Sequence, residues 1–279
     1  MNGTLPPFGV NTYSYSQRST AEDCVRSLAD QGYASVELMM YPGHLWPAEA
    51  DAERRRSLRR LCEASGLRLI TINSPNIDLN VAAACREMRE HTLGLNAAFL
   101  RLAGELGAAG LILGPGKANP LFPAPREQLL SYFHEALDRL SPIAREVGVS
   151  IFVENMPFCF LPDAQGIMRE LDRHGDPEIG VVYDVANAHF IGEDPRAGLR
   201  IVRERLKLVH YSDTTRSVYR HDPVGAGDTP FAGIPEVLAE VGFREMPMLE
   251  VISQGDADAE IRDSVARLAA LGFASYPIL

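Results

Sequence analysis

Residues 110–154 read GLILGPGKANPLFPAPREQLLSYFHEALDRLSPIAREVGVSIFVE. This stretch holds two short β-rich runs, 110–114 and 149–154, and between them a long helical segment over 126–147 that is followed by Gly148. Glycine adopts the left-handed backbone that stops a helix without steric strain, so the second run is expected to begin at once. Strand, helix and strand in this order predict a parallel pair of strands covered by a helix.

The same unit recurs along the whole chain. The expected strands span residues 8–13, 34–39, 67–73, 110–114, 149–154, 180–184, 206–211 and 246–251. The expected helices span residues 20–30, 48–64, 84–106, 126–147, 164–173, 194–204, 231–241 and 256–271. Eight units favour a closed (β/α)8 TIM barrel, because an open doubly wound sheet usually stops at about five or six strands. We therefore predict an α/β fold with a single TIM-barrel domain over 1–279. The alternative is a doubly wound domain with a small appendage, but no Gly-x-Gly-x-x-Gly follows the first strand.

The composition is that of an ordinary globular protein, with 46% hydrophobic and 23% charged residues. The net charge of −10 disfavours nucleic-acid binding. No apolar run approaches the roughly 18 residues of a membrane span, and residues 1–15 do not read as a secretory signal. The cysteines form no Cys-x-x-Cys pair, which indicates reduced thiols and a cytoplasmic location. They are Cys24, Cys62, Cys85 and Cys159.

Four consecutive strands end in a polar residue. These residues are Glu154, Asp184, His210 and Glu250. Active sites of such barrels lie at the carboxyl ends of the strands, so the four side chains should meet at one rim. Each alone could be a helix cap, an arginine partner or a satisfied buried histidine. Together they would cost several kcal/mol to bury unless a cation neutralised them. We therefore predict one divalent metal ion. Three oxygen ligands and one nitrogen favour Mn²⁺, Mg²⁺ or Co²⁺, with Mn²⁺ expected and Zn²⁺ left open.

Further polar residues follow other strands and are candidates for binding substrate. His44 lies after the second strand, where it could bind a hydroxyl while Trp46 covers the C–H face of a sugar; a loop packed by its own aromatic rings is the equal alternative. Lys117, one of two lysines, follows the fourth strand and could bind an anionic oxygen or simply face solvent. Tyr13 and Asn73 end the first and third strands and are expected to line the wall.

Four motifs in the second half of the chain resemble the xylose isomerase-like barrel superfamily. They are VEN (153–155), YDVANAH (183–189), VHYSD (209–213) and LEV (249–251). That group contains sugar and sugar-phosphate isomerases and epimerases, inosose dehydratases, hydroxypyruvate isomerases and endonuclease IV. The resemblance covers nearly the whole chain as a pattern of eight units and is sharpest over 149–251.

The resemblance implies roles for the strand-end residues. In the ketose 3-epimerases of this group, metal ligands close strands five to eight, which places them on Glu154, Asp184, His210 and Glu250. The two glutamates in those enzymes also move protons on opposite faces of the bound sugar. Glu154 and Glu250 are therefore the expected catalytic residues.

Positions near these ligands partly match and partly depart from the pattern of the same enzymes. Arg216 stands where they have an arginine that grips a substrate oxygen. Asn187 replaces their usual histidine, and Phe160 replaces an expected substrate-binding glutamate; both departures point to a different or less polar substrate. His189 and His221 lie on the loops after strands six and seven. His221 belongs to a segment, 220–228, that resembles the family's glycine-rich loop, from which a histidine or arginine often reaches the pocket.

The predicted function is that of a metal-dependent isomerase or epimerase acting on a small keto-sugar. Proton abstraction would pass through a metal-stabilised enediolate. A dehydratase or lyase acting on a keto-sugar or keto-cyclitol is the alternative. An endonuclease IV-like enzyme and a non-catalytic sugar-binding barrel are less favoured. We expect a small, unphosphorylated, sugar-like substrate and no nucleic-acid or membrane partner, and leave a homo-oligomer open.

Overall fold

Eight parallel strands close into a barrel in the computed structural model, which describes residues 8–273. The strands follow one another around the barrel in sequence order, and β1 pairs with both β2 and β8. They are β1 (Gly9–Asn11), β2 (Ser35–Met39), β3 (Arg68–Asn73), β4 (Gly110–Leu113), β5 (Ser150–Glu154), β6 (Gly180–Asp184), β7 (Leu206–Tyr211) and β8 (Met248–Leu249). The predicted (β/α)8 barrel is thereby confirmed.

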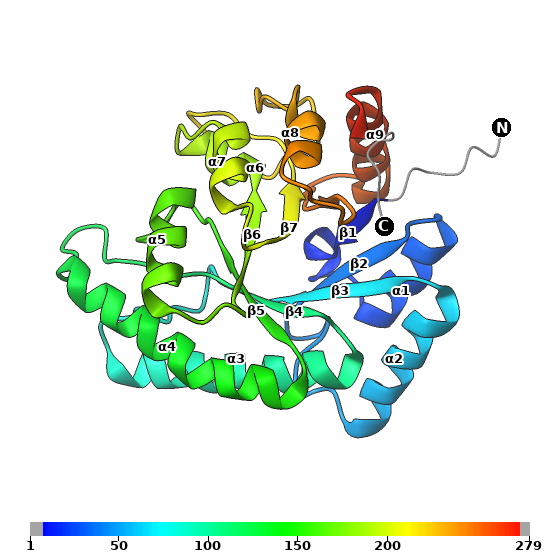
Figure 1. Ribbon diagram of the computed structural model, residues 1–279. Coiled ribbons are helices and arrows are strands. Elements are labelled where there is room, and N and C mark those ends of the chain that lie inside the picture. Colours follow the sequence, from blue (N-terminus) through cyan, green and yellow to red (C-terminus); the bar gives the residue numbers. More distant parts are fainter. Residues whose placement is uncertain (1–7, 274–279) are drawn as a thin grey trace.

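Helices cover the outside of this barrel (Figure 1). They are α1 (Ala21–Asp30), α2 (Ala52–Ser65), α3 (Arg86–Leu106), α4 (Arg126–Val147), α5 (Ala164–His174), α6 (Val185–Phe190), α7 (Pro195–Val202), α8 (Ile234–Glu240) and α9 (Ala257–Ala270). The red α9 lies near the blue β1 in Figure 1. The Tyr15 hydroxyl donates to Asp258 Oδ1 at 2.7 Å, which ties α9 to the start of the chain.

Two hydrophobic cores divide the interior. The larger lies between the strands and the helices, and it collects the outward-facing residues of the strands. The smaller lies inside the barrel, and we call it the barrel plug. It consists of Ile112, Phe152, Val182, Leu208 and Met248. Because side chains alternate along a strand, the residue two positions after each plug residue also faces inward, closer to the carboxyl end. On β5, β6, β7 and β8 those residues are the four predicted metal ligands.

In the barrel plug, the ring of Phe152 on β5 packs against glycines of the two neighbouring strands. A Cβ atom at Gly110, on the neighbouring β4, would overlap this ring, and one at Gly180, on β6, would lie 2.9 Å from it. Two glycines thus leave the space that one large aromatic side chain fills. Gly148, with φ +69°, ends α4 and turns the chain directly into β5, as expected for a left-handed helix stop.

Most element bounds differ from the sequence prediction by a few residues, and α6 and β8 depart furthest from it. Helix α6 follows β6 without a loop, whereas the sequence predicts only the helix after it; the Asp184 side chain, which accepts the Asn187 N–H, caps α6. Strand β8 has two residues, shorter than the predicted 246–251. Pro247 offers no N–H to a ladder, and beyond Glu250 the backbone bonds to loops, with Ile252 N donating to His221 O at 2.7 Å.

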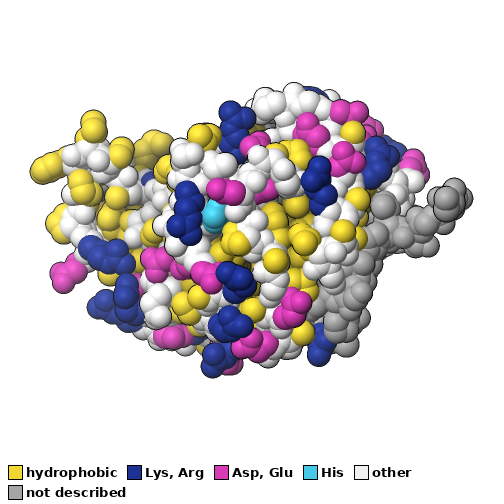
Figure 2. Space-filling view, turned by 90° about the horizontal axis from the view of Figure 1, so that it is seen from above, with side chains coloured by type: hydrophobic (Ala, Val, Ile, Leu, Met, Phe, Trp, Pro, Cys, Tyr) yellow, Lys and Arg dark blue, Asp and Glu magenta, His cyan; other side chains and the backbone are white. Residues whose placement is uncertain are grey.

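Charge is mixed on the face of the molecule seen from above in Figure 2. Acidic and basic side chains are interspersed there, with hydrophobic side chains between them, so the net negative charge does not gather into one field on this face. Within residues 8–273, no helix has the length and apolar character needed to cross a membrane.

Candidate active site

A cavity of ≈ 180 Å³ opens at the carboxyl ends of the strands. Its wall includes Glu154 from the end of β5, Glu250 just after β8, Asn187 from α6 and His221 from the loop after β7. All four of these residues are buried. The cavity therefore lies where barrel enzymes carry their chemistry, directly above the plug.

The four predicted metal ligands come together at this cavity. Glu154, Asp184, His210 and Glu250 each offer one ligand atom, and these atoms all lie within 4.8 Å of one another. His210 Nδ1 lies 3.4 Å from Glu154 Oε1, 4.0 Å from Asp184 Oδ2 and 3.2 Å from Glu250 Oε2. The barrel register pairs Asp184 directly with His210. The imidazole thus stands at the centre of three carboxylates.

Burial and mutual charge shift the pKa values of this group. Burial raises the pKa of Glu154, although His210 beside it opposes the shift, and burial raises the pKa of Asp184 to about 6. Burial alone would lower the pKa of His210, but the negative charges of Glu37 and Glu250 outweigh it and hold the pKa well above its usual value. The surrounding acids therefore favour the protonated form of the imidazole in the metal-free chain.

This donor set fits a divalent metal ion. Asp184 Oδ2 and His210 Nδ1 are buried and have no hydrogen-bond partner among the described residues, and both atoms belong to the convergent group. A buried polar atom without a partner is costly unless something else satisfies it. Three carboxylates and one imidazole are ligands that Mn²⁺, Co²⁺ and Zn²⁺ all accept. The group could hold one such ion.

The local sequence explains how Asp184 is aimed. Asn155, just after β5, accepts the Asp184 N–H through Oδ1 at 2.7 Å and donates through Nδ2 to the Asp184 carbonyl at 3.0 Å. Asp184 Oδ1 then accepts the Asn187 N–H at 2.6 Å. With its backbone and one oxygen fixed in this way, the residue directs Oδ2 into the group.

A chain of polar contacts joins the two sides of the cavity. Ser212 Oγ lies 2.9 Å from His221 Nδ1, and the Tyr219 hydroxyl lies 2.8 Å from His221 Nε2. The same hydroxyl donates to Asn187 Oδ1 at 2.8 Å, and Asn187 Nδ2 lies 3.5 Å from Glu154 Oε1. His221 and Asn187, two predicted substrate-binding residues, therefore belong to one network, to which Tyr219 is an unpredicted addition.

Glu37 is a second residue that the sequence prediction missed. Its side chain is fully buried inside the barrel, and its Oε1 lies 3.2 Å from His210 Nε2. Burial would raise the pKa of Glu37, but the positive charge of His210 and hydrogen bonds from Thr71 and Asn73 hold it below its usual value. The sequence prediction depends on polar residues at strand ends, whereas Glu37 lies within β2. The available signal was a charged residue in the middle of an otherwise apolar run.

Two predicted rim residues take other positions. His44 is buried, with Nε2 at 3.0 Å from Thr12 Oγ1 and Nδ1 at 2.7 Å from the Ser19 carbonyl, and it is not among the described residues that line the cavity. The ring of Trp46 packs edge-on against Phe99. Trp46 therefore packs against α3, and both ring nitrogens of His44 have partners outside the cavity wall.

Lys117 holds the loop after β3. Its ammonium group donates to the Asn76 carbonyl at 2.8 Å and to the Ile77 carbonyl. Asn76 and Ile77 line the cavity, whereas Lys117 lines a separate one. The lysine therefore supports part of the cavity wall from outside.

Of the four remaining predicted residues, two line the cavity and two do not. Tyr13 and Asn73 line the cavity, as expected. His189 lies behind it, with Nε2 at 2.7 Å from Asp228 Oδ1. Arg216 is exposed, and neither it nor His189 is among the cavity-lining residues within 8–273.

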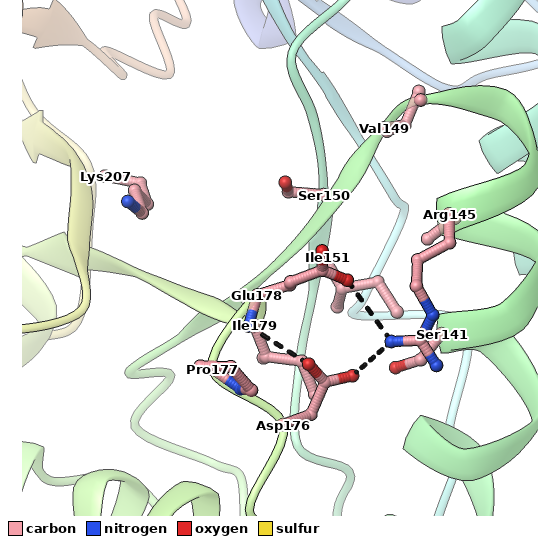
Figure 3. A pocket seen from close by; sticks show the side chains of 12 residues that line it. Ser141, Arg145, Val149, Ser150, Ile151, Asp176, Pro177, Glu178, Ile179 and Lys207 are labelled. Carbon is pink, nitrogen blue, oxygen red and sulfur yellow. Dashed lines mark hydrogen bonds and ion pairs between the residues drawn. The ribbon is translucent and has the colours of Figure 1, made fainter.

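A larger cavity, ≈ 560 Å³, lies at the opposite end of the barrel (Figure 3). It is lined by residues at the amino ends of β5, β6 and β7, among them Ser150, Ile179 and Lys207. Arg145 reaches across it to Asp176 Oδ2 at 2.9 Å and Glu178 Oε2 at 3.2 Å. The charges of Arg145 and of the two acids are thus paired with one another. This end of a barrel serves stability rather than catalysis.

Comparison with known proteins gives a family match over most of the chain. Residues 25–271 match the family described as the xylose isomerase-like TIM barrel. An uncharacterised protein of Methanocaldococcus jannaschii, MJ1311, is 22% identical over 204 residues, which cover 70% of this chain and 66% of that protein, just under two thirds of its length.

Solved structures share the fold at low sequence identity. A D-tagatose 3-epimerase-like protein superposes with a TM-score of 0.82 at 19% identity, covering 95% of this chain and 98% of the other. The 3-keto-D-glucoside 4-epimerase YcjR of E. coli gives 0.78 at 16% identity, covering 95% and 99%. An IolI protein with a bound zinc atom gives 0.80 at 15% identity, covering 97% and 99%. Epimerases are thus among the structural neighbours. Because the family match spans most of its length, the chain belongs to the xylose isomerase-like TIM barrel family.

Proposed function

We propose that this protein is a divalent-metal-dependent isomerase or epimerase of a small keto-sugar, with Glu154, Asp184, His210 and Glu250 as the metal ligands. The observation that carries the proposal is the convergence of three buried carboxylates on one imidazole, in which Asp184 Oδ2 and His210 Nδ1 make no hydrogen bond within residues 8–273. The epimerases and the zinc-bound IolI protein among the structural neighbours support it. Mn²⁺ is the ion we expect, because oxygen ligands dominate the group.

The two glutamates are placed to exchange protons with a bound sugar. When bound, the ion would polarise substrate oxygens and make an adjacent C–H bond more acidic. Glu154 and Glu250 both line the cavity, and each carries one oxygen close to His210 Nδ1. The raised pKa of Glu154 suits a group that takes up and returns a proton. One glutamate would take the proton from carbon, and the other, or the same one, would return it.

Several of the remaining wall residues carry uncharged polar groups. Asn73, Asn187 and the Tyr13 and Tyr219 hydroxyls can bind sugar hydroxyls, and no lysine or arginine is among the residues that line the cavity in the described chain. A phosphate group would therefore find no lysine or arginine in the described wall to pair with its charge. The proposed substrate is an unphosphorylated sugar.

The test is a substrate screen with metal-depleted protein. Chelator-treated protein should lose turnover of keto-sugars, and Mn²⁺ should restore it. In D₂O, the product should gain deuterium at the carbon that is deprotonated. Glu154→Gln and Glu250→Gln should each lower kcat by about 10²- to 10⁴-fold while the fold is kept. Full activity in either variant would contradict the role given to that carboxylate.

A dehydratase or lyase on the same framework is the second candidate. Phe160 packs against the outer core and its ring meets Phe133, so this position offers no carboxylate to hold a sugar hydroxyl in place. The mass of the product separates the two reactions, since dehydration removes one water and epimerisation changes no mass.

A further inference from the structure

We propose that Glu37, in the middle of β2, is a positioning residue of the metal site: it decides which nitrogen of His210 and which oxygen of Glu250 face the ion. This inference rests on the proposed function, because it concerns the same ion. It assigns a role to a buried acid that is not itself among the described residues that line the cavity.

Glu37 is surrounded by hydrogen-bond donors. Its Oε1 accepts from Asn11 Nδ2 and, at 3.0 Å, from Asn73 Nδ2, while its Oε2 accepts from Thr71 Oγ1. The barrel register pairs Asn11 with Glu37 and Glu37 with Thr71, so three adjacent strands bring these side chains to one level. These three hydrogen bonds, together with the two contacts to His210 Nε2, fix the orientation of the carboxylate.

The first consequence concerns His210. Its Nε2 lies 3.2 Å from Glu37 Oε1 and 3.3 Å from Oε2. An ionised carboxylate only accepts hydrogen bonds, so Nε2 carries a hydrogen. In the neutral ring that a metal requires, the lone pair is then on Nδ1, the atom that faces Glu154 and Glu250. A carboxylate behind a ligating histidine is a common means of fixing its tautomer and ring orientation.

The second consequence concerns Glu250. Asn11 Nδ2 and Asn73 Nδ2, which both bond to Glu37 Oε1, also donate to Glu250 Oε1, at 3.0 and 3.3 Å. Each amide has two hydrogens and can serve both acids at once. Glu250 Oε1 is therefore occupied, and Oε2 is the oxygen left near His210 Nδ1 and His221 Nδ1, at 3.2 and 3.5 Å. Glu37 thus reaches a second ligand through two asparagines.

The experiment measures Mn²⁺ binding to metal-depleted protein by calorimetry, without substrate. Glu37→Gln should weaken binding by about 10- to 100-fold, because the amide disturbs the donors around it and no longer orders the His210 ring. The matched control is Glu170→Gln, since Glu170 is also a buried glutamate but lies on α5, outside the barrel. The control should bind Mn²⁺ within about threefold of wild type. Equal affinity of Glu37→Gln and wild type would overturn the proposal.

A second measurement needs no variant at position 37 and covers the case in which Glu37→Gln does not fold. ¹⁵N NMR of the wild-type imidazoles, with His210 identified by the loss of its signals in His210→Asn, should show a hydrogen on Nε2 and the Zn²⁺ ion on Nδ1. An ion on Nε2 would refute the assignment. If Mn²⁺ binds with the predicted sensitivity to Glu37 but no keto-sugar is turned over, the proposed reaction fails while the role of Glu37 stands.

Discussion

The two oxygens of Asp184 have different surroundings. Oδ1 accepts the Asn187 N–H at 2.6 Å and so begins α6, whereas Oδ2 is buried without a hydrogen-bond partner in the described chain. One oxygen is used for folding, and in the proposed function the other would bind the ion. The two functions can therefore be separated by a substitution that keeps the shape of the side chain.

Asp184→Asn should make that separation. Asparagine caps helices as well as aspartate does, and it removes a buried charge, so the metal-free variant should unfold at a temperature equal to or above that of wild type at pH 7. Its Mn²⁺ affinity should fall at least about tenfold, because a charged ligand is lost. Thermal unfolding and calorimetric titration measure both. Asp163→Asn is the control, since Asp163 caps α5 in the same way and should leave Mn²⁺ binding unchanged. Unaltered Mn²⁺ affinity in Asp184→Asn would exclude the residue as a ligand.

At the scale of elements, β4, β5 and β6 fit together because two glycines flank one phenylalanine. Phe152 fills the barrel interior, and the neighbouring Gly110 and Gly180 have no side chain that would collide with its ring. Interiors this well packed respond to a single added methyl group. The identity of these small residues is therefore a packing requirement rather than a matter of backbone conformation.

Gly110→Ala should lower the free energy of unfolding by about 1–3 kcal/mol, because the new methyl group overlaps the Phe152 ring. Gly94→Ala is the matched control. Gly94 is an exposed residue within α3, and a Cβ atom there would meet nothing within 4 Å. This substitution should be neutral or stabilise by up to about 1 kcal/mol. Denaturant unfolding of both variants gives the comparison, and equal stabilities would contradict the packing argument.

The elements were largely predictable from sequence, and the reasons are specific. Apolar runs that end in one polar residue located β5, β6 and β7 and, with them, Glu154, Asp184 and His210. Helix α6 has too few residues to show an amphipathic period, so it was missed. Glu37 was missed because its partners come from β1, β3 and β7, and their approach depends on barrel register, which no local pattern records.

For the molecule as a whole, pH and metal should act on stability together. Asp184 has a folded pKa of about 6, above the roughly 3.9 of an unfolded aspartate. Its contribution to stability is therefore present below pH 4 and is lost as the pH rises through 6. The raised pKa values of Glu154 and His210 act in the same direction. A bound cation would offset this loss where the acids are charged.

Mn²⁺ should accordingly raise the unfolding temperature more at pH 7 than at pH 5. Thermal scans of metal-depleted protein, with and without Mn²⁺, measure the difference at each pH. In Asp184→Asn the pH dependence should be weaker. A larger Mn²⁺ effect at pH 5 than at pH 7 would contradict the proposed charge balance.

The barrel plug restricts how ligands can enter and leave the cavity. Phe152 and its neighbours fill the barrel interior below the cavity. In the proposed function, substrate, product and ion would therefore all pass through the opening at the carboxyl ends of the strands. The product would then have to leave before the next substrate could enter. The rate of product release would set an upper limit on turnover. A compound bound at that opening would block the proposed reaction without contacting Glu154 or Glu250.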